Sequence, residues 1–277
     1  MSTSLLNELR NTANKLGSCD PSWLKHDHEP EIKVVEGGTK GPEVILLHGL
    51  LGALSNWDAL FPLMEAYSKP LALHFPILTA HRSEVKVKAL AVLTEYLIRK
   101  RNLGPAVLCG NSLGGHVAMR LCLANPELVD CLILSGASGL YEHSVDSLPV
   151  RPNKEFIREH MARVFYNSQF VTDEAVEEIW QSINKRMQVL NLIHAARSAK
   201  KDNLLKLLKN IKVPTLLIWG ENDQVTTMDV AETFAMNIPN SKLITIKNCG
   251  HAPMIEYPEL FSAEVEKFLR ENSRYYK

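Results

Sequence analysis

One serine of this 277-residue chain stands in a setting that could turn its hydroxyl into a nucleophile. Ser112 lies in the motif G-N-S-L-G-G, directly after the apolar run 107–109 and at the start of an amphipathic segment. A strand that turns sharply into a helix strains the residue at the turn, and this is sterically possible only beside very small residues. The turn would hold the Ser112 hydroxyl clear of the sheet edge, at the positive end of the following helix. The other residues predicted to form this turn are Gly110, Asn111, Gly114 and Gly115.

Histidine is the residue expected to activate the serine, because a hydroxyl is a weak nucleophile and needs a base whose pKa lies near 7. Of the ten histidines, His251 is favoured, since it stands in a loop directly after the last expected strand and could reach a neighbouring strand end. His116 lies four residues beyond Ser112 on the same expected helix, so its ring should pack beside that helix. His48 ends a strand before a glycine and is expected to shape its loop.

The acid that orients this base is expected between the serine and the histidine, at another strand end. Asp223 meets this condition, because it follows the apolar run 215–219 and could accept the Nδ1–H of His251 and fix its tautomer. Glu221 and Asp229 are alternatives. Asp223 could also serve only as the cap of the helix that starts shortly after it.

Two hydrogen-bond donors are needed where negative charge develops on a substrate carbonyl, and removing one such donor typically costs about 2.7–4 kcal/mol. Backbone N–H groups suffice for this task. We assign the first to Leu113, the residue after the nucleophile. We assign the second to Leu50, in the loop H-G-L-L-G at 48–52, which follows a strand expected to neighbour that of Ser112.

Short apolar runs alternate with longer amphipathic segments along most of the chain. Runs that are nearly all apolar are typical of strands covered on both faces, and their alternation with helices predicts a parallel sheet with right-handed crossovers. The expected fold class is α/β, with a mostly parallel, twisted central sheet and helices on both faces. The expected strands are 43–47, 70–75, 106–109, 131–134, 215–219 and 242–246, and two of the expected helices are 84–101 and 113–124.

Residues 141–210 interrupt this alternation, since they show amphipathic helical pattern and no convincing strand. They precede the last two expected strands, so we interpret them as a helical cap inserted into a regular core; ordinary core helices are the alternative. The expected organisation is an N-terminal extension at 1–30, an α/β core at 31–140 and 211–277, and the cap at 141–210.

The composition is that of an ordinary globular protein, with 45% hydrophobic and 22% charged residues. The 31 basic and 31 acidic residues balance, which argues against chain-wide attraction to nucleic acid or anionic lipid. The five cysteines are scattered without a CxxC pair, so neither a disulfide framework nor a zinc site is expected. His26 and His28 form an HxH pair without supporting ligands, and we expect no metal.

No window approaches the roughly 18 uninterrupted apolar residues that span a bilayer. Residues 1–17 also lack the continuous apolar stretch of a signal peptide. We therefore expect a cytoplasmic protein that does not act at a membrane and whose partner is a small-molecule substrate. The sequence carries no signal for its oligomeric state.

Four motifs together resemble the α/β-hydrolase superfamily, in that family's order and approximate spacing: H-G-x-x-G at 48–52, G-N-S-L-G-G at 110–115, G-E-N-D-x-V at 220–225 and G-H-A-P at 250–253. The resemblance covers about residues 41–269 and matches the segment 141–210 to the family's variable cap. It implies a triad of Ser112, Asp223 and His251, a pocket between cap and sheet, and no cofactor.

The chain departs from the family pattern after residue 75, where H-F-P-I-L at 74–78 replaces the usual acidic, glycine-rich loop. The turn G-N-S-x-G-G is similar to that of meta-cleavage-product hydrolases, which break carbon–carbon bonds. Their glycine–proline-rich oxyanion loop is absent, however, and Ala252 replaces the tryptophan that follows their histidine. Serine rather than aspartate at position 112 argues against haloalkane dehalogenases and epoxide hydrolases.

The function predicted first is hydrolysis of a small ester-like substrate (a carboxylic ester, thioester or lactone) through an acyl-enzyme. The alternatives are hydrolysis of a carbon–carbon bond, and a ligand receptor that keeps the triad with negligible turnover. The side chains expected to line an apolar pocket, although they could equally pack the cap onto the core, are Phe165, Trp180, Met187, Leu190 and Met254.

Overall fold

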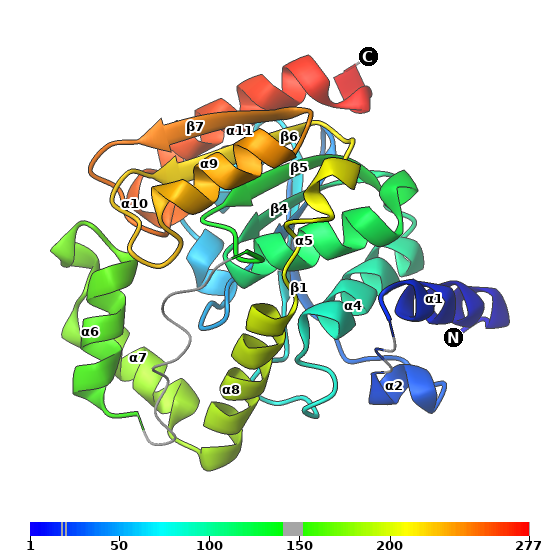
Figure 1. Cartoon of the computed structure of the whole chain (residues 1–277), viewed down its shortest axis with the longest axis horizontal. Helices are drawn as coiled ribbons and strands as arrows, with labels where there is room; N and C mark the ends of the chain where they lie inside the picture. The colour runs from blue at the N-terminus through cyan, green and yellow to red at the C-terminus, as the bar shows by residue number, and fades with distance from the viewer. Residues whose placement is uncertain (18, 20, 141–151, 277) are drawn as a thin grey trace.

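A seven-stranded sheet forms the centre of the molecule (Figure 1). The computed structural model describes residues 1–17, 19, 21–140 and 152–276. The strands are β1 (Lys33–Glu36), β2 (Glu43–Leu47), β3 (Lys69–His74), β4 (Ala106–Asn111), β5 (Val129–Ser135), β6 (Thr215–Gly220) and β7 (Ser241–Ile246). They lie in the order β1-β3-β2-β4-β5-β6-β7, and within the described residues only β1 runs antiparallel to its neighbour.

All six strands expected from the apolar runs are present. Every residue of β4, β5 and β6 is buried, as a strand covered on both faces requires. The sequence does not predict β1, because this short edge strand has exposed charged residues, Lys33 and Glu36, at its ends and carries no long apolar run. Charged side chains on a short edge strand protect the sheet from pairing with other chains.

Helices cover both faces of the sheet, which confirms the predicted α/β fold (Figure 1). One face packs against α4 (Val87–Lys100), α5 (Leu113–Ala124) and α9 (Met228–Asn237), with α1 (Thr3–Lys15) as an outer layer on α4. The opposite face packs against α3 (Phe61–Met64), α10 (Pro253–Glu256) and α11 (Pro258–Asn272). The remaining short elements are α2 (Ser22–Lys25) and the 3-10 turns Leu54–Trp57, Pro126–Leu128, Ser168–Phe170, Leu208–Asn210 and Arg274–Tyr276.

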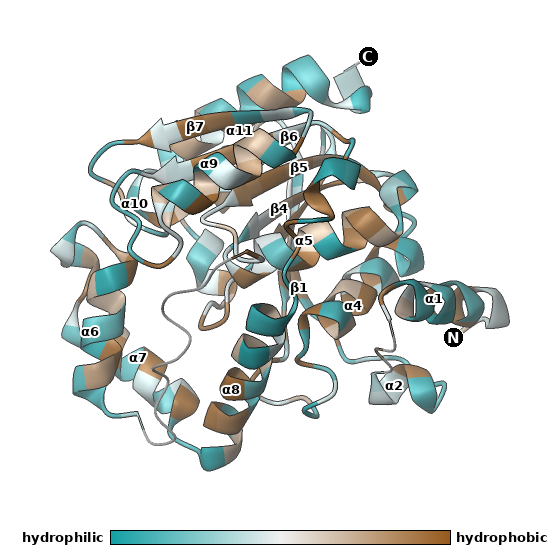
Figure 2. Cartoon of the chain, in the orientation of Figure 1, coloured by the Kyte–Doolittle hydropathy of each residue, from teal (hydrophilic) through white to brown (hydrophobic). Residues whose placement is uncertain are grey.

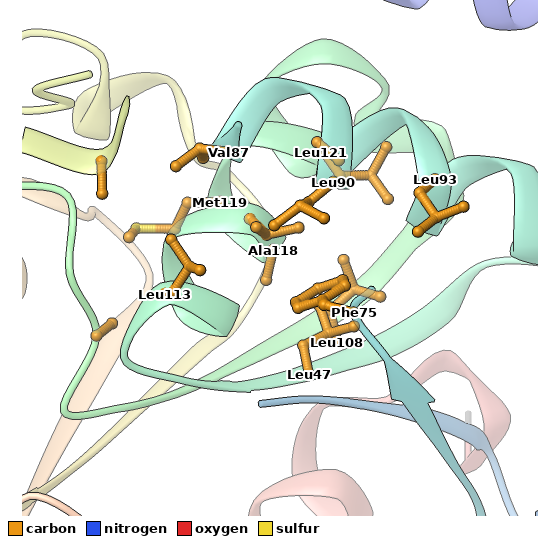
Figure 3. Close-up of a cluster of buried hydrophobic side chains, with 14 of the residues drawn as sticks. Leu47, Phe75, Val87, Leu90, Leu93, Leu108, Leu113, Ala118, Met119 and Leu121 are labelled. Carbon is orange, nitrogen blue, oxygen red and sulfur yellow. The ribbon is translucent and has the colours of Figure 1, made fainter. Parts of the chain in front are cut away.

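The larger apolar core lies between the sheet and the helices α4 and α5 (Figure 3). Leu47 of β2 and Leu108 of β4 belong to this layer with Phe75, which follows β3, and all three are fully buried or nearly so. Leu90 of α4 and Met119 of α5 belong to the same cluster. A buried side chain of this size contributes about 1.5–3 kcal/mol. Figure 2 shows the same division, with hydrophobic strands inside and hydrophilic outer helix surfaces.

Three inserted helices, α6 (Lys154–Val164), α7 (Asp173–Ile183) and α8 (Arg186–Lys201), separate β5 from β6 and extend beyond the sheet (Figure 1). Asn153 and Thr172 start α6 and α7, since each side chain accepts a hydrogen bond from the backbone of the first turn. Residues 152–210 contain no strand, as expected for the helical insertion. The rest of the predicted cap, 141–151, lies outside the described residues.

The parallel strands end at one common edge of the sheet. The strand order reverses between β2 and β4, because the chain passes from β2 to β3 on one side and then returns to β4 on the other. Ligands of open α/β sheets commonly bind in the loops outside such a switch point. The loops after β2, β4, β6 and β7, which carry the predicted chemistry, all leave the sheet at this edge.

Candidate active site

Ser112 joins β4 directly to α5 in a backbone conformation that L-amino acids seldom adopt, with φ 53° and ψ −118°. Close approaches make this turn possible only with glycine beside it. A Cβ atom at Gly114 would lie 1.9 Å from the carbonyl oxygen of Leu47, and one at Gly110 would lie 2.4 Å from the carbonyl carbon of Gly114. Backbone strain that the surrounding structure maintains is concentrated at functional turns. The strand–turn–helix context expected for a nucleophilic serine is therefore present.

His251 and Asp223 form a buried pair in the loops that follow β7 and β6. The Nδ1 atom of His251 lies 2.8 Å from Oδ2 of Asp223, and the two residues are 5% and 4% exposed. The carboxylate also accepts hydrogen bonds from the N–H groups of Val225 and Thr226, at 2.8 and 3.0 Å, and from the Thr226 hydroxyl at 3.0 Å. These donors fix the carboxylate where it can accept the Nδ1–H of His251.

The alternatives to Asp223 as the orienting acid have other partners. Glu221 is exposed and accepts a hydrogen bond from Thr245. Asp229 accepts one from Thr227. Asp223 does not cap α9 either, because Thr227 is the residue that flanks the start of that helix. The hydrogen bonds that Asp223 accepts from Val225 and Thr226 instead fix the shape of its own loop.

The backbone of His251 is fastened to the turn that carries Ser112. The side-chain amide of Asn111 donates to the carbonyl of His251 at 3.0 Å and to that of Ser135 at 3.1 Å. Within the described residues no hydrogen bond joins the Ser112 hydroxyl to the imidazole of His251. Such contacts are often long before substrate binds. The structure thus brings the loops of all three predicted triad residues to one edge of the sheet.

His48 shapes the loop after β2, as expected from its position. Its Nε2 atom accepts a hydrogen bond from the Phe75 N–H at 2.9 Å, so Nδ1 carries the proton and donates to the Gly49 carbonyl at 2.7 Å. Burial lowers the pKa of His48 to about 4, against the opposing hydrogen bond to Gly49 and with a small effect of the His74 charge. A neutral His48 therefore holds this loop at physiological pH.

The two predicted oxyanion donors flank Ser112. Leu113 directly follows it as the first residue of α5. Leu50 follows Gly49, where a Cβ atom would lie only 3.2 Å from Cβ of Ser112. The loop after β2 therefore contacts the nucleophile turn, and the roles of Leu50 and Leu113 stay predictions.

A narrow cavity of about 20 Å³, with room for about one water molecule, lies between the inserted helices and the loop after β2. Its lining is apolar, with Leu51, Phe156 and Ile179 among its members, apart from His160 of α6. Burial lowers the pKa of His160 to about 4, and the charges of His251 and Arg163 add to this effect. His160 is therefore a neutral polar group close enough to His251 to be affected by its charge.

The five predicted pocket residues do not line this cavity, and their role in a substrate pocket stays a prediction. Met187 is 65% exposed on the first turn of α8, and Met254 is fully buried in the core cluster that includes α11. Phe165 packs against Phe170, while Trp180 and Leu190 are half-buried elsewhere. An apolar residue type shows a preference for burial, but tertiary packing decides which neighbour buries it.

Sequence reasoning missed three side chains in and around this site: His160, Thr226 and Glu256. Thr226 and Glu256 follow the predicted acid and base by only three and five residues, but sequence alone does not show that they fold back onto those loops. The helical spacing of His160 with Phe156 marks one face of α6. That spacing cannot show that the face approaches His251.

Within the described residues, no group of three or more His, Cys, Asp or Glu side chains is arranged to hold a metal ion. His26 and His28 stack on each other with their ring centroids 6.4 Å apart. Each helix in the described part of the chain is too short or too polar to cross a lipid bilayer.

Comparison with known proteins identifies the family. Residues 44–264 match the profile of the α/β hydrolase family. A 2-hydroxy-6-oxononadienedioate/2-hydroxy-6-oxononatrienedioate hydrolase of Burkholderia vietnamiensis is 26% identical over 268 residues, which cover 87% of this chain and 92% of the relative. A pimeloyl-[acyl-carrier protein] methyl ester esterase of Nitrosomonas europaea is 28% identical over 244 residues, which cover 82% of this chain and 95% of the relative.

Among solved structures, an α/β hydrolase enzyme from a sediment metagenome of the Mar Chica lagoon, Morocco, is similar in fold. It has a TM-score of 0.71 and 29% sequence identity, and the match covers 88% of this chain and 97% of that one. Both relatives named above are hydrolases, and the family profile spans most of the sequence. The chain therefore belongs to the α/β hydrolase family of enzymes.

Proposed function

We propose that this protein is a serine hydrolase that cleaves a small ester-like substrate (a carboxylic ester, thioester or lactone) through an acyl-enzyme. The observation that carries the proposal is the buried 2.8 Å contact between His251 and Asp223, beside the strained turn at Ser112. Acyl transfer by serine requires a serine hydroxyl, a base and a carboxylate that orients the base.

In the proposed mechanism, the Ser112 hydroxyl attacks the carbonyl carbon while its proton moves to Nε2 of His251. The N–H groups of Leu50 and Leu113 stabilise the negative charge on the carbonyl oxygen, and Asp223 stabilises the imidazolium. The imidazolium then gives its proton to the leaving alcohol or thiol. Water attacks the acyl-enzyme, loses a proton to His251, and releases the carboxylic acid and free Ser112.

The cavity between the inserted helices and the loop after β2 is too small for a whole substrate, but its lining favours an uncharged substrate group in this part of the molecule. Its described lining is apolar except for His160, which stays neutral above about pH 4. A carboxylate placed there would lose its hydration without a cation among the described lining residues to replace it, and this is costly. We therefore place ester-like substrates before dicarboxylates. The esterase relative from Nitrosomonas europaea acts on such an ester according to its name.

Hydrolysis of a carbon–carbon bond is the second candidate. It is supported by the turn G-N-S-x-G-G at 110–115 and by the similar hydrolase of Burkholderia vietnamiensis, whose name specifies a dienedioate substrate. The same serine, histidine and aspartate would serve this reaction. The two candidates therefore differ in the substrate pocket, where the apolar lining favours the first.

We also propose that the inserted helices act as the cap predicted at 141–210. Their side chains form most of the cavity, and Leu51 of the core completes it. The carbonyl of Val164, the last residue of α6, accepts a hydrogen bond from the N–H of His251 at 2.7 Å. The inserted helices therefore contact both the loop after β2 and the loop that carries His251.

The test compares the wild-type protein with Ser112→Ala on a short aryl ester and on a ring-fission dienedioate. We expect multiple turnover of the ester by the wild type, with kcat reduced by at least about 10³-fold in the variant. Undiminished ester hydrolysis by Ser112→Ala contradicts the proposal. Faster turnover of the dienedioate supports the second candidate, and one stoichiometric burst without further turnover indicates a ligand receptor.

A further inference from the structure

The carboxylate of Glu256 joins the inserted helices to the loop that carries the proposed base. Its Oε1 atom accepts a hydrogen bond from the Gly250 N–H at 2.7 Å, one residue before His251. Its Oε2 atom accepts hydrogen bonds from the N–H groups of Tyr166 and Asn167, both at 3.0 Å, in the segment that follows α6. Each oxygen of one side chain thus holds a different part of the chain.

The same two segments also touch directly. The N–H of His251 donates to the carbonyl of Val164 at 2.7 Å. Gly250 permits this approach, because a Cβ atom there would lie 2.4 Å from the same carbonyl oxygen. On its other side, the His251 carbonyl accepts a hydrogen bond from Asn111. The backbone of the proposed base is therefore held by the inserted helices on one side and by the nucleophile turn on the other.

The chemistry of the contact explains why a carboxylate is needed. The described partners of Glu256 are backbone N–H groups and the weak thiol donor of Cys249, and no described cation forms an ion pair with it. Hydrogen bonds to an ionised acceptor are stronger than those between neutral groups. A carboxylate accepts on both oxygens, whereas a glutamine amide presents one acceptor and one NH₂ group. Glutamine could hold either segment but not both.

We propose that Glu256 is a positioning residue, which fixes the loop of His251 against the inserted helices and so keeps the imidazole aligned with Ser112. This inference rests on the proposed serine-hydrolase function. The carboxylate makes no hydrogen bond to the imidazole and does not line the cavity, so it acts through the backbone of Gly250 and His251. A displacement of about 1 Å in a reacting group can cost about 10²-fold in rate.

The main test compares Glu256→Gln with Asp130→Asn as a matched control. Asp130 is also a carboxylate that joins two segments, since it accepts hydrogen bonds from the Ser273 hydroxyl and the Arg274 guanidinium. It lies near the start of β5, at the opposite end of that strand from the site. Loss of Asp130 should therefore affect stability without moving the loop of His251.

The rate constant for labelling by a fluorophosphonate probe, measured per folded molecule, reports how well His251 activates Ser112. We expect Glu256→Gln to lower this rate constant and kcat by about 10- to 100-fold, with KM changed less than about threefold. Asp130→Asn should leave both kinetic values unchanged. If Glu256→Gln is destabilised as much as the control but is labelled at the wild-type rate, the carboxylate only stabilises the fold and the proposal is overturned.

Two further variants separate positioning from general folding. Gly250→Ala retains Glu256 but forces the two segments apart, so we expect a similar loss of labelling. Glu256→Asp retains the charge with a shorter reach and should recover part of the rate that Glu256→Gln loses. Wild-type labelling in Gly250→Ala, or equal rates in the two Glu256 variants, contradicts the proposal.

A measurement without substrate distinguishes failure of this inference from failure of the proposed function. The Nδ1 proton of His251, hydrogen-bonded to Asp223, should give a far-downfield proton NMR resonance that is absent from His251→Gln. We expect this resonance to be sharp in the wild type and in Asp130→Asn, and broadened or lost in Glu256→Gln. An unchanged resonance in Glu256→Gln contradicts positioning, whereas a wild type that shows the resonance but resists labelling contradicts the serine-hydrolase function.

Discussion

The histidines of this molecule differ in task because their ring nitrogens have different partners. Both nitrogens of His48 bond backbone groups, so its ring is a structural element of the loop after β2. His251 uses Nδ1 for Asp223, and within the described residues its Nε2 has no hydrogen-bond partner, as a general base requires. His116 is fully buried with Nε2 3.2 Å from Asp202, which confirms that it packs beside its helix. The role of His251 as the base stays a prediction.

The buried state of His48 predicts a pH-dependent stability. Its pKa falls from 6.5 to about 4 on folding, so between these values the unfolded chain binds a proton that the folded protein does not. The free energy of unfolding should therefore decrease as the pH falls from about 6.5 to 4, by up to about 3 kcal/mol from this residue. Urea denaturation across this range should show a shallower pH dependence for His48→Gln than for the wild type. Equal pH dependence in the two proteins contradicts the neutral, buried assignment.

The hydroxyl of Thr226 should contribute to catalysis through Asp223. It donates to Oδ2 of the carboxylate at 3.0 Å and lies 3.3 Å from Nδ1 of His251. Thr226→Val removes this donor at nearly constant volume, so we expect kcat for an aryl ester to fall about 10-fold, or about 1.4 kcal/mol. Thr233→Val, which removes an exposed hydroxyl bonded to a helix carbonyl, is the control and should leave kcat unchanged. Equal kcat values for the two variants argue against a role for Thr226.

At the scale of secondary structure, the sequence predicted those strands whose residues are all buried. Strands such as β4 and β5 are buried along their whole length and so appear in the sequence as apolar runs. The charged edge strand β1 lacks that signal. The cavity was not predictable, because periodicity places Phe156 and His160 on one face of α6 without naming the neighbour of that face. Glu256 was missed because two of its partners, Tyr166 and Asn167, are 90 and 89 residues away in the sequence, which does not show that the segment after α6 meets the loop at Gly250.

The junction between α8 and the core should depend on Asp202, the residue that follows this helix. Arg120 of α5 donates to both of its carboxylate oxygens, at 2.5 and 2.6 Å. Burial raises the pKa of Asp202, but its contacts with His116 and Arg120 outweigh this effect and bring the value to about 2. The pair therefore stabilises the fold above about pH 4, the range of the unfolded carboxyl group, and this contribution is lost as the pH falls to about 2.

Asp202→Asn should lower the free energy of unfolding at neutral pH by about 3 kcal/mol, because it leaves a largely buried guanidinium without its counter-charge. Asp173→Asn is the control, since its carboxylate is 86% exposed in an ion pair with Arg158. A surface pair contributes at most about 1 kcal/mol. Denaturation of both variants in urea measures the difference. Losses of equal size would mean that the junction at Asp202 contributes no more than a surface pair.

At the scale of the whole molecule, the predicted N-terminal extension packs as part of the core. Leu6 and Leu9 of α1 belong to the same apolar cluster as the residues of α4. The side-chain amide of Asn125 donates a hydrogen bond to the Thr12 hydroxyl at 2.6 Å, and the Lys15 ammonium group donates one to the carbonyl of Ala124. Residues 1–30 precede the first apolar run, so the sequence alone did not show that α1 would pack against the core.

This packing predicts that a substitution in the N-terminal helix lowers the stability of the fold without changing catalysis. Leu9 is fully buried, so Leu9→Ala should lower the free energy of unfolding by about 2–5 kcal/mol. The helix α1 is hydrogen-bonded to the C-terminal end of α5, whereas Ser112 directly precedes the N-terminal end of α5. Because α5 has 12 residues, these two ends are about 18 Å apart. We therefore expect unchanged kcat and KM for an aryl ester in the folded variant.

The exposed neighbour Asn11 provides the control, because Asn11→Ala should change the free energy of unfolding by no more than about 0.5 kcal/mol. Urea denaturation and ester hydrolysis on the same samples separate the two effects. A variant Leu9→Ala that keeps its stability would contradict the packing role of α1. A variant that remains folded but loses most of its kcat would show that this end of the molecule is coupled to the loops around Ser112. In the part of the chain that the structure describes, no hydrogen bond joins α1 to those loops, so such a result would require a movement of α5 as a whole.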